Sequence, residues 1–262
     1  MPASKIVGLE VAAALAQNAR RVALGGWSFS RRPLAAALHW AAHGGRFEEL
    51  LVLTGGIETD LLLATGVAQR VRSFYLGLEA LGLGPGLKGA YEVIEETETS
   101  LILGLNAAAE GLSFMPLPLR HAQALAELRP ELKRTRCPYS GEEHLAVPAL
   151  PIDVAYIHAW RADARGNAVF AGHKGADRLL ALAARNTVVL CEELVEDLSA
   201  EGAVAELTEP LVTHVVHAPH GAAPGACLPC YEADWPQLLN YTALERDAVA
   251  AWARRWIEGS KL

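Results

Sequence analysis

The sequence lacks several features that mark secreted and membrane-spanning proteins. Its 262 residues include only four cysteines, which do not suggest a disulfide framework in a chain of this length. The longest apolar runs, such as residues 11–16 and 179–184, fall far short of the ~20 residues needed to cross a bilayer. The first residues have neither the charged nor the apolar region of a signal peptide. We therefore expect a protein of the reducing cytoplasm, with no membrane partner.

Positive charge is also scarce. The chain has 23 Lys and Arg residues against 30 Asp and Glu residues, a net charge of −7, and no obviously basic face. This balance argues against a nucleic-acid partner and against a polybasic membrane anchor. The hydrophobic content of 52% excludes a disordered chain. A chain of this size buries roughly three quarters of its unfolded surface, so it needs no metal or disulfide to hold its core.

Short runs rich in Val and Ile alternate with longer stretches of helical periodicity. This alternation predicts an α/β fold with an open, mostly parallel sheet and helices on both faces. We expect a single domain over residues 1–262, closed by an amphipathic docking helix at about 240–258. The expected strands are residues 21–25, 50–54, 72–75, 91–95, 154–158, 187–191 and 212–217. The expected helices before the docking helix are residues 5–16, 33–43, 57–68 and 100–111.

In such a sheet, ligands bind at the carboxyl ends of the strands, in the loops that lead into helices. Four loops follow predicted strands in this way: residues 25–33, 54–60, 76–85 and 162–175. We expect the functional site to be assembled from these loops.

The first loop is a glycine turn that begins at Gly25 and Gly26 and ends at Pro33. Two glycines allow a ligand to approach the backbone closely, and Arg31 and Arg32 could pair with a phosphate or carboxylate. The turn is not a P-loop, because no Gly-Lys-Ser/Thr follows, and it lacks the third glycine of a dinucleotide site. The alternative is an ordinary strand–helix turn with solvated arginines.

Six motifs follow one another in an order that resembles a known family. They are Gly-Gly-Trp-Ser with Arg-Arg-Pro at 25–33, Thr-Gly-Gly-Ile-Glu-Thr-Asp at 54–60, the glycine-rich segment 74–85, Glu98 before its helix, Ala-Asp with Gly-Asn-Ala at 162–168, and the segment 215–227. Together they resemble class I CoA-transferases, and most closely the α (A) subunit of glutaconate CoA-transferase-type enzymes. The resemblance extends from about residue 5 to residue 231.

The resemblance implies a two-subunit enzyme, αβ or α2β2, that moves CoA between an acyl-CoA and a carboxylic acid. Its partner would be a homologous β subunit of similar size, which carries the main glutamate nucleophile. A CoA thioester would be a substrate, and no cofactor would stay bound. This chain would shape the acyl pocket, and Ser28 with the two amides of the glycine turn would bind the substrate's carboxylate. The expected substrate-binding residues are Gly25, Gly26, Ser28, Arg31, Gly55, Gly56 and Gly77.

Two glutamates are candidate catalytic residues. Glu98 stands where the α subunits of related ring-cleaving CoA hydrolases carry an active-site glutamate, although it could instead cap the helix that follows. Glu79 lies in the third loop, but Ala80-Leu81 follow it where the family's Glu-x-Gly motif would place a glycine. Two alternatives to the transferase remain: a CoA-thioester or ring-cleaving hydrolase that uses Glu98, and a non-catalytic scaffold subunit.

A metal site is the remaining alternative chemistry. The histidines at 214, 217 and 220 precede Cys227 and Cys230, and zinc sites use such residues. His214 and His217 are three residues apart on a predicted strand, so their side chains point to opposite faces. His217 or His220 with the two cysteines stays open, but we expect no metal. A Ser-His-Asp hydrolase is disfavoured, because the chain has no Gly-x-Ser-x-Gly motif.

Overall fold

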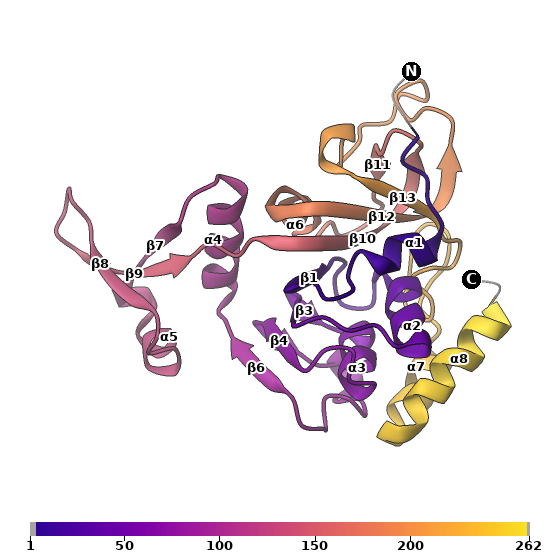
Figure 1. Cartoon of the computed structure of the whole chain (residues 1–262), viewed down its shortest axis with the longest axis horizontal. Helices are drawn as coiled ribbons and strands as arrows, with labels where there is room; N and C mark the ends of the chain where they lie inside the picture. The colour runs from indigo at the N-terminus through magenta and orange to yellow at the C-terminus, as the bar shows by residue number, and fades with distance from the viewer. Residues whose placement is uncertain (1–3, 261–262) are drawn as a thin grey trace.

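A computed structural model of the chain describes residues 4–260 and is built around one extended β-sheet (Figure 1). Its strands are β1 (Arg21–Leu24), β2 (Glu49–Leu51), β4 (Arg70–Ser73), β6 (Glu92–Glu95), β10 (Ile152–Asp163), β11 (Ala168–Val169), β12 (Ala184–Val195) and β13 (His214–His217). The order is β13-β12-β10-β1-β2-β4-β6, and all neighbours in this order are parallel. Strand β11 pairs antiparallel with β10. The seven predicted strands correspond to the seven parallel ones.

Helices cover both faces of this sheet, which confirms the predicted fold class. The helices are α1 (Leu9–Ala14), α2 (Leu34–His43), α3 (Ile57–Ala64), α4 (Glu98–Ala109), α5 (Gln123–Leu128), α6 (Asp177–Ala183), α7 (Trp235–Thr242) and α8 (Val249–Ser260). Along β1, Val22 and Leu24 join the core with α1, α2, α3 and α8, whereas Ala23 joins the core with α4 and α6. This alternation follows from the pleat of a strand, where successive side chains point to opposite faces. No described helix has the length and apolarity that a membrane crossing would require.

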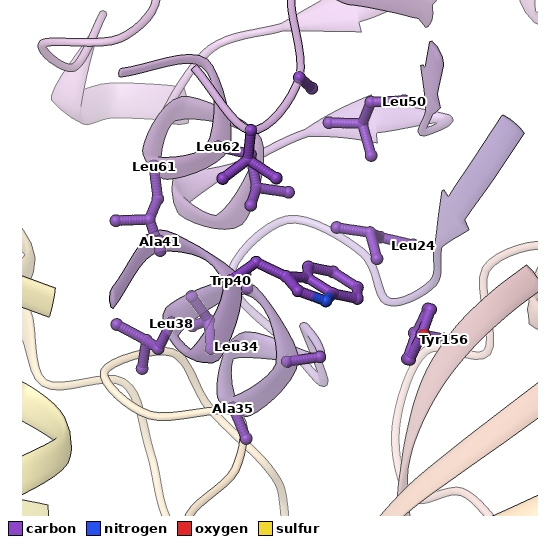
Figure 2. Packing of buried hydrophobic residues seen from close by; sticks show 14 of the residues in the cluster. Leu24, Leu34, Ala35, Leu38, Trp40, Ala41, Leu50, Leu61, Leu62 and Tyr156 are labelled. Carbon is purple, nitrogen blue, oxygen red and sulfur yellow. The ribbon is translucent and has the colours of Figure 1, made fainter. Parts of the chain in front are cut away.

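The larger core is centred on Trp40 of α2 (Figure 2). Its ring meets Tyr156 of β10 edge-on at 4.8 Å between centroids, and its Nε1–H donates to Ala13 O at 3.0 Å. The buried Tyr156 hydroxyl in turn donates to Ala12 O at 2.6 Å. Buried Trp and Tyr side chains need partners for their polar atoms, and here these two bonds attach α1 to α2 and to β10.

A small antiparallel sheet projects from the main body as an arm (Figure 1). It consists of β7 (Phe114–Pro118), β9 (Glu143–Pro148) and β8 (Lys133–Arg136), paired in that order, and it carries α5. The arm has an apolar cluster of its own, centred on Leu117, Leu125 and Leu145. The sequence did not predict these strands. Whether the arm and the body fold as the single domain expected from the sequence stays a prediction.

The C-terminal segment differs from the one docking helix expected at 240–258. It is divided into α7 and α8, and α8 packs against α2 and α3. Val249, Trp252 and Ala253 of α8 are buried in the larger core. The amphipathic pattern therefore describes α8 well, but the pattern did not show that the helix begins only at Val249.

A buried hydrogen bond ties this segment to α3. The Tyr241 hydroxyl donates to Asp60 Oδ1 at 2.6 Å, and Asp60 also accepts the backbone N–H groups of Gly86 and Leu87 at 3.0 and 2.8 Å. Burial nevertheless raises the pKa of Asp60 above its ordinary value. The C-terminal segment therefore supplies one of the hydrogen bonds that stabilise the buried Asp60 carboxyl group.

We predict that Tyr241→Phe lowers the free energy of unfolding by about 2 kcal/mol, because it removes a hydrogen bond to a buried carboxyl group. Urea denaturation followed by circular dichroism measures this loss. The matched control is Tyr139→Phe, since Tyr139 is almost fully exposed on the arm. Equal stabilities of the two variants would contradict the prediction.

Candidate active site

The glycine turn is held in place by the buried side chain of Arg31. Its guanidinium pairs with Asp177 of α6 at 2.7 Å and donates to the carbonyl oxygens of His158 and His173 at 2.9 and 2.5 Å. It also lies 4.4 Å from the centroid of the Phe170 ring. Arg31 is fully buried, so the alternative of a solvated arginine is wrong. Its position indicates that it shapes the turn and does not itself contact a substrate.

Both amides of the turn are engaged within the protein. Gly25 N–H donates to Tyr156 O, and Gly26 N–H donates to Asp177 Oδ1, both at 2.9 Å. An added Cβ at Gly25 would lie 2.5 Å from that Asp177 oxygen, so only glycine fits there. In this geometry the two amides are not free to bind a substrate carboxylate, contrary to the role expected from the sequence. Gly25 instead allows close contact with Asp177 of α6, and Gly26 allows close approach to the carbonyl oxygens of Ser30 and Arg31.

Ser28 differs from its neighbours in the turn. Its φ of 49° lies in the left-handed region, which is uncommon for residues other than glycine and recurs at functional sites. Its side chain is half-buried and makes no hydrogen bond within the part of the chain described. Of the polar groups that were expected to bind substrate in this turn, the Ser28 hydroxyl is the one still available to a ligand.

The second loop is joined to the first by Arg32. This buried side chain donates to Ser28 O and to Thr54 Oγ1, both at 2.8 Å, and lies 3.3 Å from Glu58 Oε1. Glu58 also accepts the N–H of Gly56 at 3.1 Å, at the start of α3. The loop that contains Gly56 is thus fixed against the glycine turn.

The third loop runs alongside the second. Two short strands, β3 (Thr54–Gly55) and β5 (Tyr75–Leu76), pair in parallel, and Gly77 N–H donates to Gly55 O at 3.4 Å. An added Cβ at Gly55 would lie 2.7 Å from the Leu76 side chain. Three of the four predicted loops are therefore in direct contact. The fourth joins them through the bond from Arg31 to His173 and through the stacking of His173 on Trp27 at 4.9 Å.

Glu98 is the first residue of α4, at the edge of the sheet where β6 ends. The capping box of this helix is made by Thr97 and Ser100, so Glu98 is not a capping residue but the acid of the first turn, which is the other form of the structural alternative. Its side chain is exposed and makes no hydrogen bond or ion pair with any described residue. A carboxylate in the first turn of a helix is stabilised by the helix dipole. Glu98 is therefore an accessible carboxyl group at the start of α4, after the edge strand β6.

The neighbouring Glu96 anchors this turn, a role that the sequence did not reveal. Its buried carboxylate accepts hydrogen bonds from Arg72, Arg129 and the Ser100 hydroxyl, with 2.7 Å to Arg129 Nη1. Arg72 also forms an ion pair with Glu49, which in turn pairs with Arg21. This chain of buried charges holds the first turn of α4, and so the backbone of Glu98, against β2 and β4.

Glu79 lies farther along the third loop, in a single 3₁₀ turn (Glu79–Leu81). It is exposed, and its φ of 50° is in the left-handed region. Neither fact assigns it a chemical role, and its place in the active site stays a prediction.

A cluster of buried polar groups is centred on Glu192, close to the loop that contacts the glycine turn. Glu192 of β12 accepts hydrogen bonds from His158 Nε2 at 2.6 Å, from His220 N–H at 2.5 Å and from the Tyr231 hydroxyl. The loop that carries Tyr231 reaches the turn directly, because Arg31 N–H donates to Ala226 O at 2.7 Å. Glu192 thus fixes the loop whose Ala226 carbonyl accepts the N–H of Arg31.

The same cluster includes the one group of possible metal ligands found in the described residues. Ligand atoms of His158, Glu192 and Cys227 all lie within 4.8 Å of one another. The set considered from the sequence, with Cys230 and His217 or His220, is not brought together in this way. Spacing in the sequence could not reveal the actual cluster, because His158 and Glu192 lie on adjacent strands of the sheet. Since Glu192 already accepts three hydrogen bonds, the cluster has a structural explanation without a metal.

Glu192 links the stability of this region to pH. Burial alone would raise the pKa of Glu192, but the hydrogen bonds from His158 and Tyr231 hold it below its ordinary value of 4.5. A carboxyl group whose pKa is lowered by folding stabilises the folded state at pH values above its ordinary pKa. That stabilisation is lost as the pH falls through the lower, folded-state pKa.

We predict that Glu192→Gln lowers the free energy of unfolding at pH 7 by about 3 kcal/mol, because strong hydrogen bonds to a buried carboxylate are weakened. The difference from the unaltered protein should shrink as the pH falls below about 4.5. Denaturant titrations at several pH values measure both effects. Glu193→Gln, at an exposed neighbour, is the control and should change little. A difference that does not vary with pH would contradict the prediction.

The fold and the convergence of its loops define a class of α/β protein with a site at the carboxyl edge of a parallel sheet. The sequence profile of the Coenzyme A transferase family matches residues 8–218, which include all four loops and Glu98. The chain belongs to this family. The resemblance recognised from the ordered motifs is thereby confirmed.

Individual relatives agree with this assignment. The chain is 30% identical to the A subunit of 3-oxoadipate CoA-transferase from Pseudomonas knackmussii, over 87% of this chain and 85% of the relative. The crystal structure of glutaconate coenzyme A-transferase from Acidaminococcus fermentans superposes with a TM-score of 0.86 and 26% identity, over 97% of this chain and 89% of that one. A variant of the decarboxylase AibA/AibB superposes with a TM-score of 0.88 and 29% identity, over 98% and 99%. The fold is thus shared by proteins with different named activities.

Proposed function

We propose that this chain is the α subunit of a heteromeric CoA-transferase of the glutaconate type, which moves CoA between an acyl-CoA and a carboxylic acid. The observation that carries the proposal is the family match across residues 8–218, which takes in every loop that meets at the glycine turn. Two relatives are the A subunits of their enzymes, which supports a partnership with a β subunit. The substrate is a CoA thioester.

The main nucleophile is a glutamate of the β subunit. Its carboxylate attacks the thioester carbonyl and releases the CoA thiolate, which leaves an acyl–glutamyl anhydride. The thiolate then attacks the glutamyl carbonyl, so that the donor acid departs and a glutamyl-CoA thioester remains. The same steps then run in reverse with the acceptor acid. Its carboxylate attacks the glutamyl-CoA thioester and releases the CoA thiolate, and the thiolate attacks the acyl carbonyl of the new anhydride, which gives the new acyl-CoA and restores the glutamate. This chain contains no Glu-x-Gly at Glu79, which favours a nucleophile on the partner.

In this proposal the chain supplies one wall of the site. The Ser28 hydroxyl, unpaired in a rigid turn, donates to the acyl substrate, and the loops at Gly55, Gly56 and Gly77 shape the pocket. Glu98 faces the reacting thioester from the edge of the sheet. A carboxylate at a helix N-terminus can act as a base or can orient the incoming acid.

The alternative is a CoA-thioester hydrolase in which Glu98 activates water. Its exposed and unpaired carboxylate favours this candidate, because a general base must be able to reach a water molecule. The two reactions differ in where oxygen and CoA go. In H₂¹⁸O, a hydrolase places ¹⁸O in the free acid without needing an acceptor, whereas a transferase leaves CoA covalently bound to a glutamate.

The experiment uses the native complex, purified through a tag on this chain. Mass spectrometry of the complex after reaction with acyl-CoA should show a CoA adduct on a glutamate of the partner. Solvent oxygen in the product without an acceptor acid would instead support the hydrolase, and release of CO₂ would support a decarboxylase. Lack of acyl-CoA binding and of all three activities would indicate a non-catalytic scaffold.

We predict that Glu98→Gln in the complex lowers kcat by at least about 100-fold, because the variant has the same shape but no carboxylate to act as a base. Steady-state kinetics measures the loss, and size-exclusion chromatography checks that the complex still assembles. Glu95→Gln is the matched control, since Glu95 is also exposed and precedes Glu98 by three residues. Full activity of Glu98→Gln would remove Glu98 from the mechanism. The same measurement on Glu79→Gln would show whether Glu79 takes part in catalysis.

A further inference from the structure

The fourth loop of the site ends in a short turn between Gly172 and Gly175, just before α6. Their φ values of 78° and 55° lie in the left-handed region, which favours glycine at both positions. The turn carries two polar side chains, those of His173 and Lys174. Lys174 is paired with Glu206, with 2.7 Å between Lys174 Nζ and Glu206 Oε1. His173 is therefore the residue of this turn whose side chain remains available to a ligand.

The imidazole of His173 is held in one orientation. It stacks on the ring of Trp27, with 4.9 Å between the centroids and 28° between the ring planes. The backbone of His173 is fixed as well, because its carbonyl oxygen accepts a hydrogen bond from the buried Arg31 guanidinium at 2.5 Å. Trp27 also contacts Phe74 of the third loop, with 6.4 Å between centroids. The imidazole thus lies where the first, third and fourth loops meet.

A hydrogen bond determines which nitrogen of this ring carries the proton. His173 Nδ1 accepts the backbone N–H of Gly175 at 3.0 Å, and a backbone N–H can only donate. Nδ1 therefore has no proton in this geometry, and the proton of the neutral ring is on Nε2. No residue in the described part of the chain forms a hydrogen bond with Nε2. His173 consequently offers a donor at Nε2, and not a base.

The stacked ring lies near the part of the glycine turn that is open to a ligand. Trp27 directly precedes Ser28, whose hydroxyl makes no hydrogen bond within the part of the chain described. The backbone of the fourth loop also approaches this turn, since a Cβ added at Gly175 would lie 3.6 Å from Gly26 O and 3.9 Å from the Trp27 ring. Two unpaired donors, a hydroxyl and an imidazole N–H, are thus carried by adjoining loops.

We propose that His173 donates a hydrogen bond from Nε2 to the carbonyl oxygen of the acyl-CoA thioester. This oxygen gains negative charge when a nucleophile attacks the carbonyl carbon, so a donor already in position stabilises the transition state more than the bound substrate. A neutral imidazole can do so without giving up its proton. Stacking on Trp27 holds the donor in place before the substrate binds. The inference rests on the proposed function, because it takes an acyl-CoA thioester as the substrate.

Two substitutions separate the donor from the ring. His173→Phe keeps an aromatic ring to stack on Trp27 but removes the N–H, whereas His173→Gln loses the ring and keeps a side-chain N–H. In the native complex we expect His173→Phe to lower kcat by on the order of 100-fold, with little change in KM. His173→Gln should recover part of this loss. His121→Phe is the control, because His121 is exposed between β7 and α5 and should leave both constants unchanged.

Infrared spectroscopy tests the hydrogen bond itself. The probe is an analogue of glutaconyl-CoA in which CH₂ replaces the sulfur, so that it keeps the carbonyl oxygen but cannot release CoA. A hydrogen bond to a carbonyl oxygen lowers its stretching frequency. With ¹³C in the carbonyl group, the band of the bound analogue should therefore lie at lower frequency in the unaltered complex than in His173→Phe.

Three results would overturn the proposal: full kcat in His173→Phe, the same band position in both complexes, or no binding of the analogue to the unaltered complex. An equal loss of kcat in His173→Phe and His173→Gln would also count against it, since a donor at this position would then make no difference. These outcomes are distinct from failure of the proposed function. A band shift that depends on His173 supports the inference even if no CoA adduct forms on the partner, and an adduct without the shift supports the transferase alone.

Discussion

The site depends on the buried ion pair between Arg31 and Asp177, whose side chains are 0% and 1% exposed. Two charges removed from water are better tolerated when additional hydrogen bonds satisfy their remaining polar groups. Here the backbone supplies three such partners, the carbonyls of His158 and His173 and the N–H of Gly26, whereas Arg31 Nε has no partner among the described residues. The pair thus joins the turn after β1 to the start of α6. The other loops of the site contact the turn that this ion pair holds in place.

The buried charged side chains of this protein mainly hold separate segments together. The polar side chains that remain accessible near the loops of the site are a different set. Arg32 and Glu58 join the first two loops, and Glu96 holds the start of α4. Ser28 and Glu98, by contrast, are not engaged within the described chain. Breaking the bonds of a buried, paired side chain is costly, so a substrate can bind only to the accessible groups such as Ser28 and Glu98. This division separates residues that position the site from residues that can meet a ligand.

The parallel sheet could be predicted because β1, β10 and β12 contain buried stretches rich in Val, Ile, Leu and Ala, and the loops followed from strand order. Strands β4 (RVRS) and β6 (EVIE) are more polar, and only their few β-branched residues indicated them. The arm could not, since β7 contains prolines and β8 is rich in Lys and Arg, neither of which resembles a buried strand. Arg31 was misjudged for a different reason: its partner Asp177 lies 146 residues away, and no local pattern reveals such a pair. The cluster at Glu192 was missed because its donors come from three separate segments.

The hydrogen bonds of the glycine turn also determine how it can open. The amides of Gly25, Gly26 and Arg31 donate to Tyr156, Asp177 and Ala226, which belong to β10, to α6 and to the loop before Tyr231, whereas Trp27 and Ser30 bond to each other within the turn. None of the first three bonds can break by fraying of the turn alone, since each has its acceptor on a different, packed segment. Amide hydrogens held in this way exchange with solvent only through a larger cooperative opening. The amides of Gly25, Gly26 and Arg31 therefore exchange slowly, although amides in loops of this length are usually among the fastest to exchange.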